Sequence, residues 1–296
     1  MLFRLEGDAM DATRERSARM LDAGAIEGMA RRLRRDVVEM LAEAGSGHPG
    51  GSLSAADIVA ALYFGVMRHD PAEPKMPERD RFILSKGHAA PVLYAVLAES
   101  GYFGREELKT LRKLGSMLQG HPDSTKTPGV EVSTGSLGNG LAIANGIALG
   151  LRLQGSDEPR VFCLLGDGEL QEGLVWEAAM FAAQQRLERV IAIVDHNGLQ
   201  IDGRTTEIVT VDPVAEKFRA FGWEAINVDG HDVRALLTAF DEASGRHGKP
   251  TVIVAETVKG AGVSFMEDRC EWHGVAPSEE QAEAALAELE QLPENA

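Results

Sequence analysis

The chain has 296 residues, of which 44% are apolar and 26% are charged, the ordinary balance of a globular protein. Its 46 acidic residues outnumber the 30 basic ones, so the formal net charge is −16. This sign argues against nucleic acid and anionic membranes as partners, because both attract basic proteins. An anionic ligand would need help from a metal ion or from backbone N–H groups.

Cysteine content and hydropathy narrow the class further. The two cysteines, Cys163 and Cys270, exclude a disulfide framework and a cysteine-rich zinc site. The first residues include Glu6 and Asp8 and do not resemble a signal peptide. The apolar segment at 55–67 is too short to span a bilayer. We therefore expect a soluble protein of a reducing compartment, the cytoplasm.

The first part of the chain predicts helices separated by glycine-rich loops. Apolar residues recur three or four apart over 18–44, which predicts a helix. The glycine-rich run at 45–51 predicts a loop, after which Ser52 or Ser54 is expected to cap a helix that continues through Val66. A second glycine-rich stretch, at 135–140, is expected to open a helix that reaches Leu153.

The second part alternates short apolar runs with helical patterns, as in a sheet with both faces covered. The predicted strands cover 161–165, 190–194, 225–228 and 251–255, and the predicted helices cover 176–185, 214–221 and 233–243. Ser278 and Gln281 form a capping box for a last helix, with Leu286, Leu289 and Leu292 on its apolar stripe. The pattern predicts a doubly wound α/β fold with a mostly parallel sheet and helices on both faces.

This length is compatible with one domain, because single α/β domains of about 250 residues are common. We expect a single domain over 1–296, with an N-terminal extension at 1–25 and a C-terminal helix and tail at 277–296.

Two polar turns follow two consecutive predicted strands. Gly166-Asp167-Gly168-Glu169 follows the strand at 161–165, and Asp195-His196-Asn197-Gly198-Leu199 follows the strand at 190–194. The interval from Asp167 to Asn197 is about the length of one strand–helix–strand unit, so parallel neighbours would bring both side chains to one sheet edge. Two hard oxygen ligands suit Mg²⁺ or Ca²⁺, with a shell completed by diphosphate and water.

The pair of turns is similar to the pattern of thiamine-diphosphate enzymes, and the wider context resembles transketolases. The residues after Gly166, Asp167-Gly168-Glu169-Leu170-Gln171-Glu172-Gly173 with Trp176-Glu177-Ala178, resemble the transketolase version of the turn. The other matching motifs are Ser46-Gly47-His48-Pro49-Gly50, Ser85-Lys86-Gly87-His88-Ala89, Gly120-His121-Pro122, Thr134-Gly135-Ser136-Leu137-Gly138 and Trp272-His273-Gly274. They run in the family's order from about residue 27 to 277, nearly the whole chain.

The resemblance implies a role for each matching residue. Asp167, Asn197 and the carbonyl of Leu199 would hold the divalent ion, Mg²⁺ or Ca²⁺. The residues expected to contact thiamine diphosphate are His88, Gly135, Ser136, Leu137, Gly168, Asn197, Lys259 and His273. His48, His121 and His273 would be the catalytic residues, binding substrate hydroxyls and moving protons, since histidine titrates near neutral pH. His69, His196, His231 and His247 match no such motif, and we interpret them as structural.

The resemblance also implies a partner. Full transketolases are about twice this length, and their remaining half supplies the pyrimidine-binding and C-terminal domains. We therefore expect the N-terminal subunit of a split transketolase, active only with a C-terminal partner in an α₂β₂ heterotetramer. Its expected activity is transfer of a two-carbon ketol unit from a ketose phosphate to an aldose. A fragment of a longer chain is the alternative, although 293–296 resembles a natural polar end.

Two other functions remain open at this point. A related thiamine enzyme, such as a deoxyxylulose-phosphate synthase, shares the metal motif but differs after Gly166-Asp167-Gly168. A cofactor-binding subunit without turnover is the non-enzymatic alternative, and the intact set of histidines argues against it.

Overall fold

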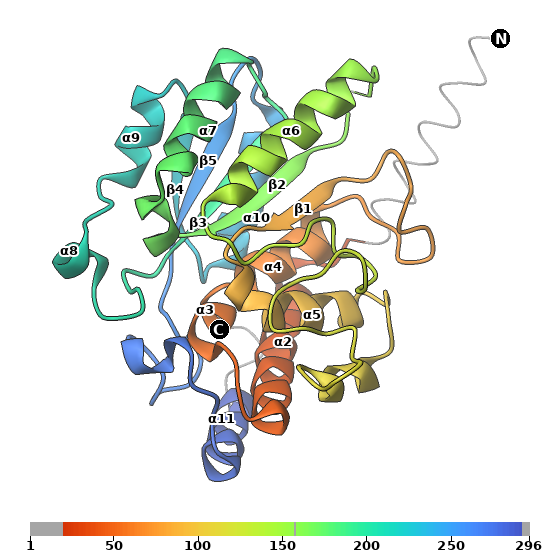
Figure 1. Cartoon of the computed structure of the whole chain (residues 1–296), viewed down its shortest axis with the longest axis vertical. Coiled ribbons are helices and arrows are strands. Elements are labelled where there is room, and N and C mark those ends of the chain that lie inside the picture. Colours follow the sequence, from red (N-terminus) through yellow and green to blue (C-terminus); the bar gives the residue numbers. More distant parts are fainter. Residues whose placement is uncertain (1–19, 157, 292–296) are drawn as a thin grey trace.

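A parallel β-sheet forms the centre of the molecule (Figure 1). The computed structural model describes residues 20–156 and 158–291. Within them the sheet has five strands in the order β1-β2-β3-β5-β4, and every neighbouring pair is parallel. The strands are β1 (Arg81–Leu84), β2 (Val161–Gly166), β3 (Val190–His196), β4 (Glu224–Asp229) and β5 (Thr251–Glu256). The carboxyl ends of the strands therefore lie at one edge.

Helices cover both faces of this sheet. One layer contains α6 (Asn139–Leu153), α7 (Gly173–Gln184) and α9 (Val214–Ala220). The other contains α2 (Ala23–Ala44), α4 (Ala56–Ala61), α5 (Ala90–Glu99), α10 (Val233–Gly245) and α11 (Glu279–Gln291). Successive residues of a strand pack against opposite helix layers. In β2, Phe162 and Leu164 pack in the core beneath α2, whereas Cys163 and Leu165 pack in the core beneath α6 and α7. Burial on both faces explains why the strands are apolar at successive positions.

Shorter elements complete the described chain. They are α3 (Pro49–Ser54), the π-helix η1 (Leu62–Val66), η2 (Gly87–Ala89), η3 (Arg105–Thr110), η4 (Gly168–Gln171), α8 (Thr205–Ile208) and η5 (Cys270–His273). No helix among residues 20–156 and 158–291 is long and apolar enough to cross a membrane.

The predicted α/β class and parallel sheet are confirmed. The four predicted strands are present with boundaries shifted by a few residues at most, and the predicted capping box forms in both directions. The Gln281 side chain accepts the Ser278 N–H at 2.9 Å, and the Gln281 N–H reaches the Ser278 hydroxyl at 3.2 Å. Ala18 and Leu292 lie outside the described residues. The division into a domain at 1–296 with an extension at 1–25 and a tail at 277–296 stays a prediction.

The prediction of a loop over 45–51 is wrong in its second half, because α3 begins at Pro49. Proline suits the first turn of a helix, since its missing N–H would be unsatisfied there anyway. A Cβ on Gly50 would lie 3.0 Å from both the Lys259 side chain and the Trp272 carbonyl oxygen, so glycine permits the close approach of α3 to these residues.

Neither Ser52 nor Ser54 caps the next helix, which corrects the second expectation for this region. Both lie inside α3, and Ser54 donates its hydroxyl to the Asp195 carboxylate at 2.6 Å. The helix expected to run through Val66 instead ends as α4 at Ala61, and the wider π-helical turn η1 follows it.

Candidate active site

Four segments that follow strands meet at the carboxyl edge of the sheet. The β1 end leads to Lys86 and His88, and the β2 end to Asp167. The β3 end leads to Asn197 and the β5 end to Lys259. In α/β proteins ligands bind at this edge, because the strand-to-helix loops gather there. The order of the strands thus brings together residues that are far apart in the sequence.

The four histidines that resemble transketolase residues form one cluster at this edge. The ring centroid of His48 lies 5.4 Å from that of His88, 6.4 Å from that of His121 and 5.5 Å from that of His273. His88 and His273 are stacked with their centroids 5.0 Å apart. The structure therefore brings all four predicted site histidines together.

Burial keeps these rings uncharged. Desolvation, helped by the positive charge of Arg112, lowers the pKa of His48 to about 4. Burial and the nearby Lys86 lower the pKa of His88 to about 2, and burial and Lys259 lower that of His273 to about 3. Burial also lowers the pKa of His121, which is the most exposed of the four. Neutral imidazoles can each donate one hydrogen bond and accept another.

The three predicted metal ligands lie on adjacent turns. The Asp167 carboxylate accepts the Gly168 N–H at 2.8 Å and the Gly198 N–H at 2.5 Å. It thus reaches the turn that carries Asn197 and Leu199. Burial and the neighbouring Asp195 carboxylate raise the pKa of Asp167 to about 6.

These groups fit a hard divalent cation by the chemistry of their donors: a carboxylate, an amide oxygen and a backbone carbonyl. A carboxylate has about four acceptor positions, so Asp167 retains capacity beyond its two N–H partners. The Asn197 amide nitrogen donates to Asp195 at 3.2 Å, and the amide oxygen accepts the Leu199 N–H at 3.2 Å. That oxygen has a second lone pair, which is available to a cation. The described residues contain no cluster of three or more His, Cys, Asp or Glu side chains able to hold a metal. The coordination shell of a metal ion bound by Asp167 would therefore depend on the Asn197 amide oxygen and the Leu199 carbonyl oxygen.

The predicted cofactor turn, with Gly135, Ser136 and Leu137, lies against the histidines. Gly135 has a φ of +134°, and a Cβ there would lie 2.8 Å from the His121 ring. The Ser136 hydroxyl accepts a hydrogen bond from Asn139 at 2.9 Å. At the facing turn, a Cβ on Gly168 would lie 3.1 Å from the side chain of Gln200. Both glycines allow a close backbone approach that a side chain would obstruct.

Lys259 is buried in the site. Its ammonium group donates to the Leu199 carbonyl oxygen at 3.3 Å and lies 2.9 Å from His273 Nδ1. Burial lowers the pKa of Lys259 to about 8, so the ammonium form persists at neutral pH. This is a positive charge in an otherwise acidic protein, at the place where a diphosphate is expected.

A buried carboxylate missed by the sequence reasoning joins three of the site's turns. Glu169 accepts the hydroxyl of Ser85, the N–H of Gly138 at 2.9 Å and the N–H of Gly166 at 3.1 Å. Burial raises its pKa. Its position directly after Gly166-Asp167-Gly168 is the sequence feature that could have indicated a role for Glu169 in the site.

A second missed feature is the buried ion pair between Lys86 and Asp195. Asp195 also accepts the hydroxyls of Ser54 and Thr257, and Lys86 donates to the Gly51 carbonyl oxygen at 2.7 Å. Burial opposes ionisation of the Asp195 carboxyl, but the Lys86 ammonium holds the pKa of Asp195 below its usual value. The pair lies beneath the histidines and joins α3 to the ends of β1, β3 and β5.

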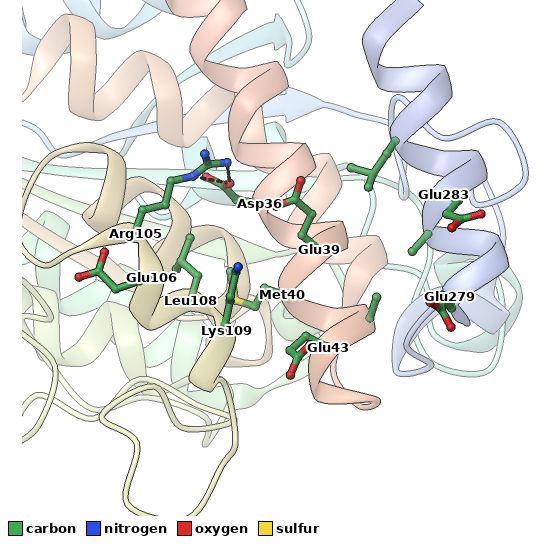
Figure 2. A pocket seen from close by; sticks show the side chains of 13 residues that line it. Asp36, Glu39, Met40, Glu43, Arg105, Glu106, Leu108, Lys109, Glu279 and Glu283 are labelled. Atoms are coloured by element: carbon green, nitrogen blue, oxygen red, sulfur yellow. Dashed lines mark hydrogen bonds and ion pairs between the residues drawn. The ribbon is translucent and has the colours of Figure 1, made fainter.

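A separate groove of about 800 Å³ lies away from this cluster, between α2, η3 and α11 (Figure 2). Its lining includes the carboxylates of Glu39, Glu43 and Glu283, and Arg105 binds the buried Asp36 there. Burial raises the pKa of Asp36 to about 6. None of the predicted site residues lines this groove.

Comparison with known proteins identifies the family. The family described as "Transketolase, thiamine diphosphate binding domain" matches residues 26–295. The chain belongs to the transketolase family. It is 44% identical to the 6-deoxy-6-sulfo-D-fructose transketolase subunit SqwG of Clostridium sp. (strain MSTE9), over 90% of this chain and 96% of that protein. It is also 44% identical to an apulose-4-phosphate transketolase subunit of Actinobacillus succinogenes, over 89% of this chain and 95% of that one.

Longer transketolases share the same region. The human transketolase is 45% identical over 90% of this chain, which corresponds to 42% of the human protein. The crystal structure of the transketolase from Campylobacter jejuni superposes with a TM-score of 0.85 at 34% identity, over 91% of this chain and 43% of that one. The chain is therefore a thiamine-diphosphate-binding transketolase chain, which decides against the synthase alternative. It corresponds in extent to the proteins named as separate subunits.

Proposed function

We propose that this transketolase chain binds thiamine diphosphate with Mg²⁺ or Ca²⁺ at the carboxyl edge of its sheet and works with a C-terminal partner subunit in the cytoplasm. The reaction is transfer of a two-carbon ketol unit from a ketose phosphate to an aldose acceptor. The observation that carries this proposal is the meeting of four neutral histidines and the Lys259 ammonium beside Asp167 and Asn197.

The residues divide into a diphosphate end and a reacting end. Asp167, Asn197 and the Leu199 carbonyl would hold the divalent ion, and Lys259 would add a positive charge for the diphosphate. His88, Gly168 and the turn Gly135-Ser136-Leu137 would complete the contacts. When bound, thiamine diphosphate supplies the nucleophilic carbon that takes up and releases the two-carbon unit.

The histidines are suited to binding and protonating sugar oxygens. Because the Lys259 ammonium donates to His273 Nδ1, the neutral ring of His273 carries its hydrogen on Nε2 and can donate it to an oxygen. His48 Nδ1 is buried without a hydrogen-bond partner within the described chain, so the fold alone does not satisfy this ring. His121 is exposed at the rim of the cluster, where it can exchange protons with water. We assign His48, His121 and His273 as the catalytic residues.

Assembly as a heterotetramer with two copies of each subunit is part of the proposal. The two relatives that this chain covers to 95% and 96% of their own length are named as subunits. The outer surface of α6 and α7 exposes Leu153, Met180 and Phe181, which supports a protein contact there. Glu172 and Glu177, at the start of α7, resemble acidic residues of the family's dimer contact.

The identity of the donor sugar is a separate part of the proposal. The two subunit relatives are named for 6-deoxy-6-sulfo-D-fructose and for apulose-4-phosphate, and this chain is 44% identical to each. We keep a ketose phosphate as the proposed donor and test sulfonated and free ketoses beside it.

The test is reconstitution with the product of a neighbouring open reading frame that encodes the remaining transketolase domains. The mixture, with thiamine diphosphate and Mg²⁺, is expected to consume a ketose donor and extend an aldose acceptor by two carbons, measured by mass spectrometry. If removal of divalent ions with a chelator abolishes turnover, and added Mg²⁺ or Ca²⁺ restores it, the proposed metal requirement is supported. If the mixture binds the cofactor but consumes none of the phosphorylated, sulfonated or free ketoses, the chain would instead be a cofactor-binding subunit without turnover.

A further inference from the structure

A tight turn at the end of β4 lies against the segment that carries Lys259. The Gly230 N–H donates to the Glu256 carbonyl oxygen at 2.7 Å, and a Cβ on Gly230 would lie 2.4 Å from the Thr257 side chain. Asp229 accepts the backbone N–H of His231 at 2.9 Å. Asp232 caps α10 by accepting the Ala235 N–H at 3.0 Å. The turn is therefore fixed at both ends and holds His231 between them.

Both nitrogens of the His231 ring are hydrogen-bonded. The Val258 backbone N–H donates to Nε2 at 2.8 Å, and Nδ1 lies 2.7 Å from the Asp57 carboxylate. A backbone N–H can only donate, so Nε2 is the acceptor and Nδ1 carries the hydrogen that is donated to Asp57. This pattern requires the neutral ring in one tautomer.

Asp57 is itself held in place from the opposite side. It lies on α4, and the Arg34 guanidinium on α2 binds both of its carboxylate oxygens. The Asp57 and Arg34 side chains are 9% and 7% exposed, so little water competes for these bonds. A continuous chain of contacts thus runs from α2 through α4 and the β4 turn to the backbone of Val258.

Val258 is the residue directly before Lys259, and it is 38% exposed. On the other side of Lys259, the Gly260 N–H donates to the Gly50 carbonyl oxygen at 3.1 Å. The Lys259 carbonyl oxygen accepts the Asp268 N–H at 2.9 Å. On the N-terminal side, the Thr257 N–H donates to the His196 carbonyl oxygen at 3.1 Å, and the Thr257 hydroxyl donates to Asp195. The bond to His231 holds the next residue, Val258, on the solvent-facing side of Lys259.

We propose that His231 is a positioning residue, whose Nε2 fixes the backbone at Val258 so that the Lys259 ammonium stays between the Leu199 carbonyl and His273. The inference rests on the proposed function, in which Lys259 contacts the cofactor's diphosphate. Its consequence is that His231 sets the affinity for an anion it does not touch. At saturation the bound diphosphate would itself hold the Lys259 ammonium beside His273, so the chemical step would not depend on His231.

Two substitutions separate the two hydrogen bonds of the ring. His231→Asn retains a donor near Nδ1 for Asp57 but is too short to reach Val258. His231→Gln places an amide oxygen near the position of Nε2, where it can accept the Val258 N–H. His247→Asn is the matched control, because the His247 side chain is 76% exposed and remote from Lys259 in the fold.

The first readout needs neither cofactor nor partner. Hydrogen exchange of a peptide covering residues 256–262 is measured by mass spectrometry on the full chain. His231→Asn is expected to speed exchange in this peptide, and His231→Gln and the control to leave it near wild type. Equal exchange in wild type and His231→Asn overturns the proposed anchor, even if the protein proves not to bind thiamine diphosphate.

The second readout is the affinity of the assembled enzyme for thiamine diphosphate in the presence of Mg²⁺, measured by titration calorimetry, together with its kcat at saturating cofactor. We expect His231→Asn to raise the Kd roughly three- to tenfold, as for one lost hydrogen bond, with kcat unchanged and with rescue by His231→Gln. Equal weakening by both substitutions, or a loss of kcat alone, overturns the positioning role. Failure of the wild-type assembled enzyme to bind the cofactor would instead refute the proposed function.

Discussion

The rings of His88 and His273 stack with their centroids 5.0 Å apart at an interplanar angle of 30°. Burial, Lys86 and the neighbouring rings of His273 and His48 lower the pKa of His88 to about 2, and burial and Lys259 lower that of His273 to about 3. In the unfolded chain a histidine titrates near 6.5, so below that pH the unfolded state binds protons that the folded state does not. The contribution of these two histidines to the free energy of unfolding therefore falls as the pH is lowered from about 6.5 towards 3.

We predict that His88→Asn makes this acid destabilisation less steep. For His88 alone the slope is at most about 1.4 kcal/mol per pH unit over this range. Urea unfolding of the variant and wild type at pH 7, 6 and 5 measures it, with the exposed His247→Asn as the control. A variant whose stability falls as steeply as that of wild type would show that His88 is not held neutral.

Removal of the Asp167 carboxylate is predicted to abolish retention of thiamine diphosphate. The carboxylate is the one charged group among the three proposed metal ligands, and a metal-bound diphosphate depends on that charge. Asp167→Ala should keep the circular dichroism spectrum of wild type, and Asp241→Ala, on the exposed surface of α10, should retain cofactor. Equally tight binding by Asp167→Ala would refute the metal assignment.

Two of the three histidines assigned as catalytic, His121 and His273, are predicted to affect turnover more than stability. His121→Ala and His273→Ala should each lower kcat of the assembled enzyme roughly 10²-fold or more, as is typical of lost acid–base catalysis. Steady-state kinetics at saturating cofactor, paired with thermal unfolding, separates the two effects. If the variants unfold at a lower temperature than wild type but keep its kcat, both residues have a structural role and not a catalytic one.

Local sequence is enough to predict the site residues that lie in glycine turns after strands. Asp167 and Asn197 are expected at one edge because neighbouring parallel strands must end together, and the 2.5 Å contact from Asp167 to the Gly198 N–H confirms their proximity. The gathering of His48, His88, His121 and His273 follows instead from the family resemblance. No spacing rule connects four loops that meet only in three dimensions.

The elements that sequence patterns miss lack a periodic signal. β1 is a strand of four residues, too short to show alternation, and α5 is buried at nearly every position, so it presents no polar face. Long-range polar contacts escape prediction for a related reason. The role of His231 is invisible in the sequence because its partners, Asp57 and Val258, are distant from it and meet it only through the sheet order.

The buried ion pair of Lys86 and Asp195 predicts a large loss of stability on removal of one partner. Lys86→Met would leave the Asp195 carboxylate buried without a counter-charge, which destabilises proteins by about 3–5 kcal/mol. We expect the lower end, because Ser54 and Thr257 still donate to it. Adding Asp195→Asn should recover part of the loss in urea unfolding. A double variant less stable than Lys86→Met would show that the charge is not what destabilises the single variant.

The last prediction is that the isolated chain performs no ketol transfer. The aminopyrimidine ring of the cofactor needs an apolar, aromatic pocket and a carboxylate, but the three tryptophans here are committed elsewhere. Trp176 and Trp223 both pack against Phe218, and Trp272 packs against Phe265 and donates to its carbonyl oxygen. We therefore expect the site to hold the diphosphate end of the cofactor and to leave the ring to another domain.

Alone, the chain should bind thiamine diphosphate weakly and show no turnover. Once a C-terminal subunit is present, affinity and activity should appear together, because each composite site then spans an interface. Calorimetric titration before and after mixing, with size-exclusion chromatography and light scattering for the heterotetramer, measures both. Steady turnover by the isolated chain, purified from a host lacking its own transketolase, would mean that the pyrimidine pocket is built within this chain after all.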